Sequence, residues 1–276
     1  MKELKDIVEE VRAVALEAGA FIRRQRLSFD QGRVEKKGAH DYVSYVDKEA
    51  EKMIVAGLER IVPEAEFVTE ERTSEREKGR ENASCETQQS DTRLTWVVDP
   101  LDGTTNYIHG LPPYCVSIAL RDDDEILVGV VYEIVCDELF STYKGAPSWL
   151  NGEEIHVSDA KTVNEALINI GYPYDVEHWS PKLRTLIQRL YGNCASIRNY
   201  GSAAAELCYI ASGRFDAYIE SYLKPWDVAA GGLILKNAGG EVTDSGYGSE
   251  WQKGEEVIAT NGLIHAELTD TVKSIL

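Results

Sequence analysis

An apolar run that ends at two aspartates constrains the fold of this chain more than any other feature. The letters LTWVV at residues 94–98 are typical of a buried strand, and Asp99 and Asp102 follow at once in the sequence DPLDGTTN. Burying two carboxylates costs several kcal/mol per charge unless a partner compensates for the lost water. The pattern therefore requires a metal, a basic partner, or a turn that returns both side chains to water.

Helical and strand patterns alternate on both sides of this run. Apolar residues spaced three and four apart predict helices, and short apolar runs predict strands. The expected helices cover residues 4–26, 44–63, 180–192, 202–213, 225–240 and 262–276. The expected strands cover residues 66–71, 114–120, 126–135, 138–144, 166–173, 194–201, 214–221, 240–244 and 256–261, the second to fourth as an antiparallel meander. The pattern weakens near residue 150, so we expect two α+β parts, 1–150 and 151–276.

The composition restricts the possible partners. The 276 residues carry 47 acidic and 29 basic side chains, a net charge of −18, which repels nucleic acids and anionic membranes. No 18 uncharged apolar residues run together and the start, MKELKDIVEE, lacks the core of a signal peptide, so we expect a cytoplasmic protein. The scattered cysteines, without a CxxC pair, indicate reduced packing residues rather than disulfides or a zinc site. They are Cys85, Cys115, Cys136, Cys194 and Cys208.

Other acids also lie at or near the ends of expected elements. Glu70 and Glu71 follow the apolar pair FV, Asp227 opens an expected helix, and Asp47 lies inside another. Each acid taken alone is explained by a helix cap, a turn or a solvated edge. Taken together, the acids supply the oxygen ligands that Mg²⁺ prefers. Two such ions about 3.5–4 Å apart stabilise the attacking and leaving oxygens of a phosphoryl transfer.

Two glycine-led segments are suited to phosphate, because the free N–H groups at a helix start favour anions. They are Gly103-Thr104-Thr105 and Gly201-Ser202-Ala203. Haloacid-dehalogenase-type phosphatases also place DGT after a strand, but with the acids two apart in D-x-D-G-T, whereas here they are three apart. The chain contains neither the H-C-x₅-R loop of cysteine phosphatases nor the G-x-S-x-G motif of serine hydrolases.

The motif WVVDPLDGTTN, with EE upstream and KPWDVAAGG…NAGG downstream, resembles the inositol monophosphatase family of Mg²⁺-dependent, lithium-sensitive phosphatases. The resemblance covers nearly the whole chain, and its two signatures occur in the family's order. It implies an α+β fold, the layered αβαβα sandwich shared with fructose-1,6-bisphosphatases. It also implies a homodimer that hydrolyses a small polyol or sugar phosphate, inositol monophosphate above all, with two to three Mg²⁺ per subunit.

The resemblance also assigns roles to single residues. It implies Glu70, Asp99 and the carbonyl of Leu101 as ligands of a first metal, and Asp99, Asp102 and Asp227 as ligands of a second. Glu70 would also hold a weaker third ion. Thr104, with Asp47 or Glu70, would deprotonate the attacking water, and Lys36 would lie on a mobile flap. The implied substrate contacts, apart from Asp102, Thr104 and Asp227, are Gly103, Thr105, Gly201, Ser202, Ala203 and Glu220.

Two departures from the family pattern bear on the site entrance. Thr69 stands where the family usually has glycine, and the polar segment from Arg72 to Arg93 is longer than usual. The substrate stays open, because fructose 1,6-bisphosphate and 3′(2′),5′-bisphosphate nucleotides are handled by relatives. An interaction protein with a vestigial site is the alternative from another class, and the intact set of acidic ligands disfavours it.

Overall fold

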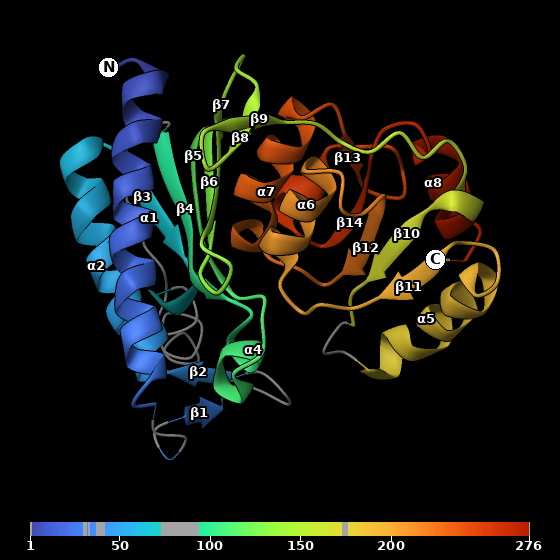
Figure 1. Cartoon of the computed structure of the whole chain (residues 1–276), viewed down its shortest axis with the longest axis horizontal. Coiled ribbons are helices and arrows are strands. Elements are labelled where there is room, and N and C mark those ends of the chain that lie inside the picture. The colour runs from blue at the N-terminus through green and yellow to red at the C-terminus, as the bar shows by residue number, and fades with distance from the viewer. Residues whose placement is uncertain are drawn as a thin grey trace, which may run out of the picture.

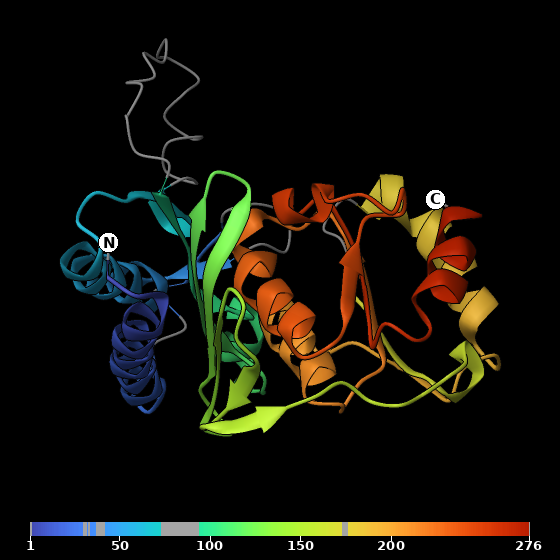
Figure 2. The same cartoon turned by 90° about the horizontal axis from the view of Figure 1, so that it is seen from above.

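Two β-sheets alternate with three layers of helices along the long axis of the molecule (Figures 1 and 2). This computed structural model describes residues 2–29, 32, 34–36, 42–72, 94–172 and 176–275, with only the backbone described for 34–36, 42–43 and 176–180. The order of layers confirms the expected α+β sandwich. The core is divided accordingly into three apolar clusters: one between the first helices and the larger sheet, one around the middle helices between the two sheets, and one between the smaller sheet and the last helices.

The first helical layer consists of α1 (Leu4–Arg26) and α2 (Tyr45–Ile61). Its apolar stripe packs on one face of the larger sheet, and the expected spacing of buried residues is observed in α1. Gly19 lies where α1 crosses that sheet, and a Cβ atom there would overlap the ring of Tyr132. The helix therefore approaches the sheet closely because this residue has no side chain.

The larger sheet has seven strands in the order β3-β4-β5-β6-β7-β8-β9. Strands β3 and β4 are parallel and the remaining pairs are antiparallel, so the expected meander is confirmed. The hairpin of the last two strands was not expected, because each has only three residues and little apolar content. The bounds are β3 (Glu66–Thr69), β4 (Leu94–Asp102), β5 (Cys115–Asp122), β6 (Glu125–Glu133), β7 (Glu138–Tyr143), β8 (Ser148–Leu150) and β9 (Glu153–Ile155).

The middle layer consists of α6 (Ala203–Ala211) and α7 (Pro225–Asn237), which lie between the two sheets in both views (Figures 1 and 2). Every residue of α6 is buried, as expected for a helix covered on all sides. Small residues let α7 approach the larger sheet closely. Gly129 lies in the sheet and Ala230 in α7, and a Cβ atom on Gly129 would come within 2.8 Å of the carbonyl oxygen of Ala230. The middle layer therefore holds the two sheets together.

The smaller sheet has five strands in the order β11-β10-β12-β14-β13, of which the first three are parallel. Helices α5 (Val176–Leu190) and α8 (His265–Lys273) cover its outer face (Figure 1). The carboxyl ends of β10, β11 and β12 therefore meet at one edge of the sheet. The bounds are β10 (Leu167–Ile170), β11 (Ser196–Arg198), β12 (Ala217–Ser221), β13 (Glu241–Thr243) and β14 (Glu256–Thr260).

Short elements complete the described chain: the hairpin of β1 (Val34–Lys36) and β2 (Tyr42–Ser44), helix α4 (Thr104–His109), and 3₁₀ turns at Val163–Glu165 and Glu250–Lys253. No helix within the described ranges combines the length and apolar character needed to cross a membrane. The four cysteines of these ranges are free thiols. Cys85 and the polar segment 73–93 lie outside the described residues.

Candidate metal centre and active site

Three aspartates meet where the larger sheet faces the middle helices. One carboxylate oxygen each from Asp99, Asp102 and Asp227 lies within 4.8 Å of the other two. Asp99 and Asp102 end β4, whereas Asp227 lies in the first turn of α7, so the cluster joins distant parts of the chain. Asp99 and Asp102 are only 3% and 8% exposed. The structure therefore brings together the three acids that the resemblance implies for one metal.

Backbone groups hold two of these carboxylates in place. The N–H of Leu101 donates to Asp99 Oδ1 at 2.8 Å, and the N–H of Lys224 donates to Asp227 Oδ2 at 2.7 Å. These are the turn and cap contacts expected for an aspartate taken alone. Each contact engages one oxygen and leaves the second oxygen of the same carboxylate available. The capping role and a ligand role are therefore compatible.

Asp102 is held by groups from outside its own strand. Its Oδ2 accepts hydrogen bonds from the Ser202 hydroxyl at 2.6 Å, the Ala204 N–H at 2.9 Å and the Cys115 thiol at 3.5 Å. Hydrogen bonds from the start of α6 thus fix the position of the end of β4. Cys115, expected only to fill space, and Ser202, expected to meet substrate, both contact the same ligand oxygen.

The three aspartates are costly to ionise together. Burial is the largest cause of the raised pKa of Asp99, followed by the charges of Glu70, Asp102 and Asp227. Burial and then the charge of Asp102 raise the pKa of Asp227. A divalent cation among these oxygens would remove the repulsion, and an all-oxygen donor set suits a hard ion. The residues present therefore fit Mg²⁺.

Glu70 lies beside this cluster. It begins the short helical segment 70–72 after β3, and its charge contributes to the raised pKa of Asp47, Asp99 and Asp227. Its neighbour Glu71 is 4% exposed and its backbone N–H donates to Glu51 at 2.8 Å, on the α2 side of the segment. The position of Glu70 is compatible with the ligand role that the resemblance implies for it.

Thr104 and Asp47 form a hydrogen-bonded pair next to the aspartates. The Thr104 hydroxyl lies 2.9 Å from Asp47 Oδ1 and 2.9 Å from the carbonyl oxygen of Leu101. The other oxygen of Asp47 accepts from the N–H of Ser44 at 2.9 Å and from its hydroxyl at 2.6 Å. Burial raises the pKa of Asp47 to about 6, so it is mostly ionised at neutral pH and able to accept a proton.

Ser44 was missed by the sequence analysis although its signal was present. It is the N-cap of α2, and with Asp47 three residues later it forms a capping box. The capping contacts fix the carboxylate that faces Thr104. The spacing of Ser44 and Asp47, a serine three residues before an acid at a helix start, is therefore the sequence signal for a residue that positions the site.

The expected substrate residues are divided between the surface and the interior. Thr105 and Gly201 are exposed, whereas Ser202 and Ala203 are 1% and 6% exposed. Gly103 has a φ of +87°, and a Cβ atom there would lie 3.3 Å from the carbonyl oxygen of Gly201 and 3.0 Å from that of Pro113. The two glycine-led loops thus touch, and only glycine permits both the left-handed backbone and this approach.

Glu220 lies at the end of β12, half-buried, on the other side of the middle layer. The Tyr218 hydroxyl donates to its Oε2, and a Cβ atom on Gly171 would overlap its carboxylate. Burial raises the pKa of Glu220 to about 7. Its carboxyl group is therefore confined by β10 and β12 rather than free in solvent.

Two remaining expectations concern the site entrance. Lys36 ends β1, and only its backbone is described. Thr69, which stands in place of the usual glycine, is 1% exposed. Its side chain is enclosed next to the sheet and does not line an opening.

Comparisons with known proteins identify the family of this chain. Residues 3–276 match the model of the inositol monophosphatase family. The chain belongs to this family. It is similar to the Nus factor SuhB of Escherichia coli K12, with 36% identity over 91% of this chain and 89% of that protein. It is also similar to the inositol-1-monophosphatase of Mesorhizobium japonicum, with 34% identity over 95% and 94% of the two chains.

Solved structures of the family have the same architecture. The extragenic suppressor protein SuhB of Bartonella henselae superimposes with a TM-score of 0.86 at 33% identity, covering 98% of this chain and all of that one. The match extends over both sheets and all three helical layers. It confirms the fold inferred from the inositol monophosphatase motifs.

Proposed function

We propose that this protein is a Mg²⁺-dependent phosphomonoesterase that hydrolyses a small polyol or sugar phosphate, with inositol monophosphate as the first candidate. The observation that carries the proposal is the meeting of Asp99, Asp102 and Asp227 beside the Thr104–Asp47 pair, in which Asp47 is buried and Thr104 half-buried. A structural role alone does not account for three carboxylates whose pKa values are all raised by burial, with repulsion from neighbouring acids in addition at Asp99 and Asp227. Family membership supports the same chemistry.

Thr104 and Asp47 are placed to orient and deprotonate a water molecule. With its hydrogen directed to Asp47, the Thr104 oxygen accepts a hydrogen bond from that water and turns a lone pair of the water toward phosphorus. The proton removed passes to Asp47, or to Glu70 nearby. When bound, Mg²⁺ supplies charge that stabilises the attacking and leaving oxygens of the displacement.

The remaining residues bind the ion and the leaving group. Asp99, Asp102, Asp227 and Glu70, with the carbonyl of Leu101, would hold two to three ions per subunit. The start of α6 keeps Asp102 fixed through Ser202 and Ala204. Glu220, near the carboxyl end of β12, would accept a hydrogen bond from a hydroxyl of the substrate. We also propose a cytoplasmic homodimer inhibited by lithium, as expected for the family.

A second candidate function follows from the relatives. The similar protein of Escherichia coli is named Nus factor SuhB, and the second candidate for this chain is an interaction protein with a vestigial site. A protein with only a regulatory role would not need the acidic cluster, and this chain retains every acid that the family resemblance implies as a metal ligand. We therefore place catalysis first and treat a regulatory role as an addition to it.

A panel of phosphate esters tests the proposal. Phosphate release is measured with and without Mg²⁺ for inositol 1-phosphate, fructose 1,6-bisphosphate, adenosine 3′,5′-bisphosphate and p-nitrophenyl phosphate. We expect Mg²⁺-dependent turnover, highest for inositol 1-phosphate. Asp99→Asn should keep the fold and lower kcat/KM by roughly 10³-fold, because the loss of several kcal/mol of charge stabilisation corresponds to three decades in rate. Absence of turnover on every ester, or normal turnover in Asp99→Asn, would contradict the proposal.

A further inference from the structure

Helix α6 carries one buried acid that the proposed mechanism does not use. Glu206 is 1% exposed, and every other residue of α6 is apolar except Tyr209, whose ring is also buried. Its Oε1 accepts hydrogen bonds from the backbone N–H groups of Tyr200 and Gly201, each at 2.8 Å. Glu206 therefore holds the turn between β11 and α6, which contains a residue expected to meet substrate.

The second oxygen of Glu206 lacks a hydrogen-bond partner among the residues that the structure describes. Leaving a buried oxygen unsatisfied costs about 1–3 kcal/mol, and more for a charged group. The side-chain amide of Asn169, which is 0% exposed, likewise lacks a partner within the described chain. Unsatisfied groups of this kind are usually satisfied by a buried water.

These groups lie near Glu220. Asn169 is opposite Tyr218 in the parallel register of β10 and β12, so the two side chains share a face of the smaller sheet. The Tyr218 hydroxyl on that face donates to Glu220. After burial, the charge of Glu220 is the largest cause that raises the pKa of Glu206, to about 8. The two acids are therefore electrostatic neighbours at the carboxyl edge of the sheet.

The positions of the two acids differ in one important respect. Glu220 is half-buried at the end of β12, whereas Glu206 is 1% exposed. The Glu220 carboxylate occupies the space that a side chain at residue 171 would fill, because Gly171 has none. A change at Glu206 would therefore act on the Tyr200–Gly201 turn that its oxygen holds and, through the charge interaction between the two acids, on Glu220.

We propose that Glu206 is a positioning residue that orients Glu220 and the Tyr200–Gly201 turn, so that the site selects phosphate esters whose leaving group carries hydroxyls. One oxygen of Glu206 fixes the turn, and the other holds a buried water that reaches Glu220. The inference rests on the proposed phosphatase function. It extends that function from the phosphate, which the aspartates handle, to the part of the substrate that the aspartates do not contact.

The test compares an ester with a hydroxylated leaving group with one that has none. Inositol 1-phosphate offers hydroxyls to Glu220, whereas p-nitrophenyl phosphate does not, and the ratio of their kcat/KM values measures selectivity. Glu206→Gln retains an oxygen for both N–H groups and replaces the second oxygen by an amide donor. We expect kcat/KM to fall about tenfold for inositol 1-phosphate, mainly through KM, and to stay within about twofold for p-nitrophenyl phosphate.

The controls separate positioning from a merely structural role. Glu153→Gln, at an exposed site on β9, should leave both rates unchanged. In a Glu220→Gln background the further effect of Glu206→Gln on the ratio of kcat/KM values should disappear, because Glu206 acts through Glu220. Thermal unfolding of each variant reports the fold. Since the Glu206 carboxyl is mostly protonated at pH 7, the glutamine exchanges one neutral group for another.

The outcomes distinguish this inference from the proposed function. A wild-type protein that hydrolyses neither ester with Mg²⁺ would overturn both. A wild-type protein active on both esters, with a ratio that Glu206→Gln leaves unchanged or with equal losses for the two esters, would overturn only the positioning role. Persistence of the Glu206→Gln effect without Glu220 would likewise show that Glu206 does not act through it.

Discussion

The hydroxyl of Thr104 lies between two acceptors, Asp47 and the carbonyl of Leu101, each at 2.9 Å. Thr104→Ala removes this hydroxyl without removing a metal-binding carboxylate. Because positioning and proton removal contribute about 10²–10⁴-fold, we expect kcat to fall by that factor while the Mg²⁺ concentration for half-maximal activity changes little. Steady-state kinetics over a Mg²⁺ titration measure both quantities. Thr104→Ser keeps the hydroxyl and should retain most activity.

A fully active Thr104→Ala variant would remove the Thr104–Asp47 pair from the mechanism. A variant that instead requires far more Mg²⁺ would show that Thr104 acts on the metal site through Leu101. The comparison with the serine variant identifies the hydroxyl, rather than the methyl group, as the source of any loss.

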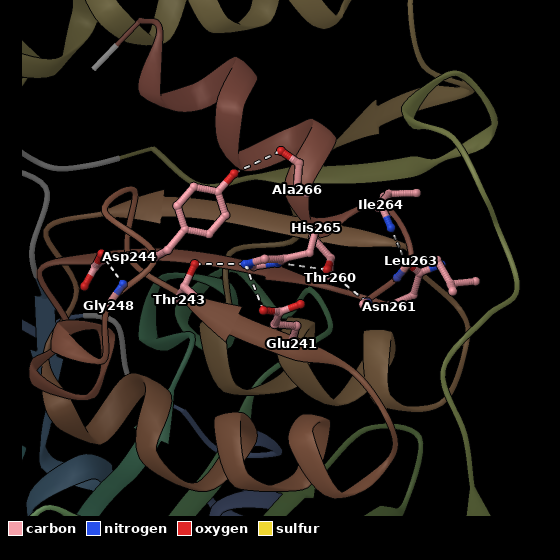
Figure 3. A network of polar contacts seen from close by, with 12 residues as sticks. Glu241, Thr243, Asp244, Gly248, Thr260, Asn261, Leu263, Ile264, His265 and Ala266 are labelled. Carbon is pink, nitrogen blue, oxygen red and sulfur yellow. Dashed lines mark hydrogen bonds and ion pairs between the residues drawn. The ribbon is translucent and has the colours of Figure 1, made fainter.

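His265 is a buried histidine whose protonation opposes folding. Its ring lies between the hydroxyls of Thr243 and Thr260, at 2.9 and 3.0 Å, with Glu241 at 4.0 Å (Figure 3). Burial lowers its pKa below the usual 6.5. In the unfolded chain the ring gains a proton as pH falls through about 6.5, whereas the folded protein gains it only at lower pH. The stabilisation by His265 is therefore full above that value and decreases below it.

We expect this effect in urea unfolding at saturating Mg²⁺. The free energy of unfolding of the wild type, relative to a His265→Gln variant, should fall between pH 7.5 and 5.5, by at most about 1.4 kcal/mol per pH unit. Using the variant as reference removes the contributions of the carboxylates, which are common to both proteins. A constant difference across this range would show that the folded ring titrates normally.

The sequence pointed to the three acids that meet in the aspartate cluster, but not to the residues that hold them in place. Acids at the end of an apolar run must be compensated, so Asp99 and Asp102 were recognisable from local sequence alone. Ser202 and Cys115 hold Asp102, yet they come from other strands and helices, and only the fold brings them to it. Glu206 was equally hidden, because a single charged residue in an apolar helix does not reveal what it faces.

At the level of elements, the contact of α1 with the larger sheet is set by Gly19. A methyl group there raises helix propensity by about 1 kcal/mol but overlaps the Tyr132 ring. We expect overpacking to prevail, so that Gly19→Ala lowers the free energy of unfolding by about 1–3 kcal/mol. Urea unfolding measures the loss. Glu17→Ala, exposed on the same helix, should change the stability by less than about 0.5 kcal/mol.

An increase in stability for Gly19→Ala would mean that the ring moves aside at little cost. In that case helix propensity, rather than close packing, would determine the effect of this position. Glu17→Ala, at an exposed position, shows how much helix propensity alone changes the stability in this helix.

Most helices and strands were predictable because their apolar patterns were long and regular. Helix α1 has the expected bounds, since buried apolar residues repeat at helical spacing from Ile7 to Ile22, over about four turns. The hairpin of β8 and β9 was missed because short strands with exposed glutamates, such as Glu153 and Glu154, carry no periodic signal. Their pairing depends on the neighbouring strand β7 instead.

At the level of the whole molecule, the metal-free protein carries uncompensated acids. Asp99, Asp102 and Asp227 all have raised pKa values in the folded state. Their contribution to stability is full below the unfolded pKa, near 3.9, and is lost as pH rises through the folded pKa. Mg²⁺ binds the ionised form and should restore this loss. Its effect on the melting temperature should therefore grow with pH.

Thermal unfolding in Mg²⁺ and in EDTA, at pH 6 and pH 8.5, measures this effect. At a hundredfold excess over the dissociation constant, binding contributes about 2.7 kcal/mol, a shift of several degrees. We expect the larger shift at pH 8.5 and a much smaller one in Asp99→Asn at both values. An equal shift at the two pH values, or an undiminished one in the variant, would place the ion elsewhere.

The aspartate cluster joins the end of β4 to the start of α7, two points separated along the chain by five of the seven strands of the larger sheet and three of the five of the smaller one. An ion bound there would act as a removable cross-link that closes this long loop. Like a disulfide across distant residues, it would tie the first half of the sequence to the second, but it would do so by binding the folded chain rather than by restricting the unfolded one. Unlike a disulfide, it would form and break with the supply of magnesium. Resistance to proteolysis in the segment between the two elements would then report the magnesium available to the protein.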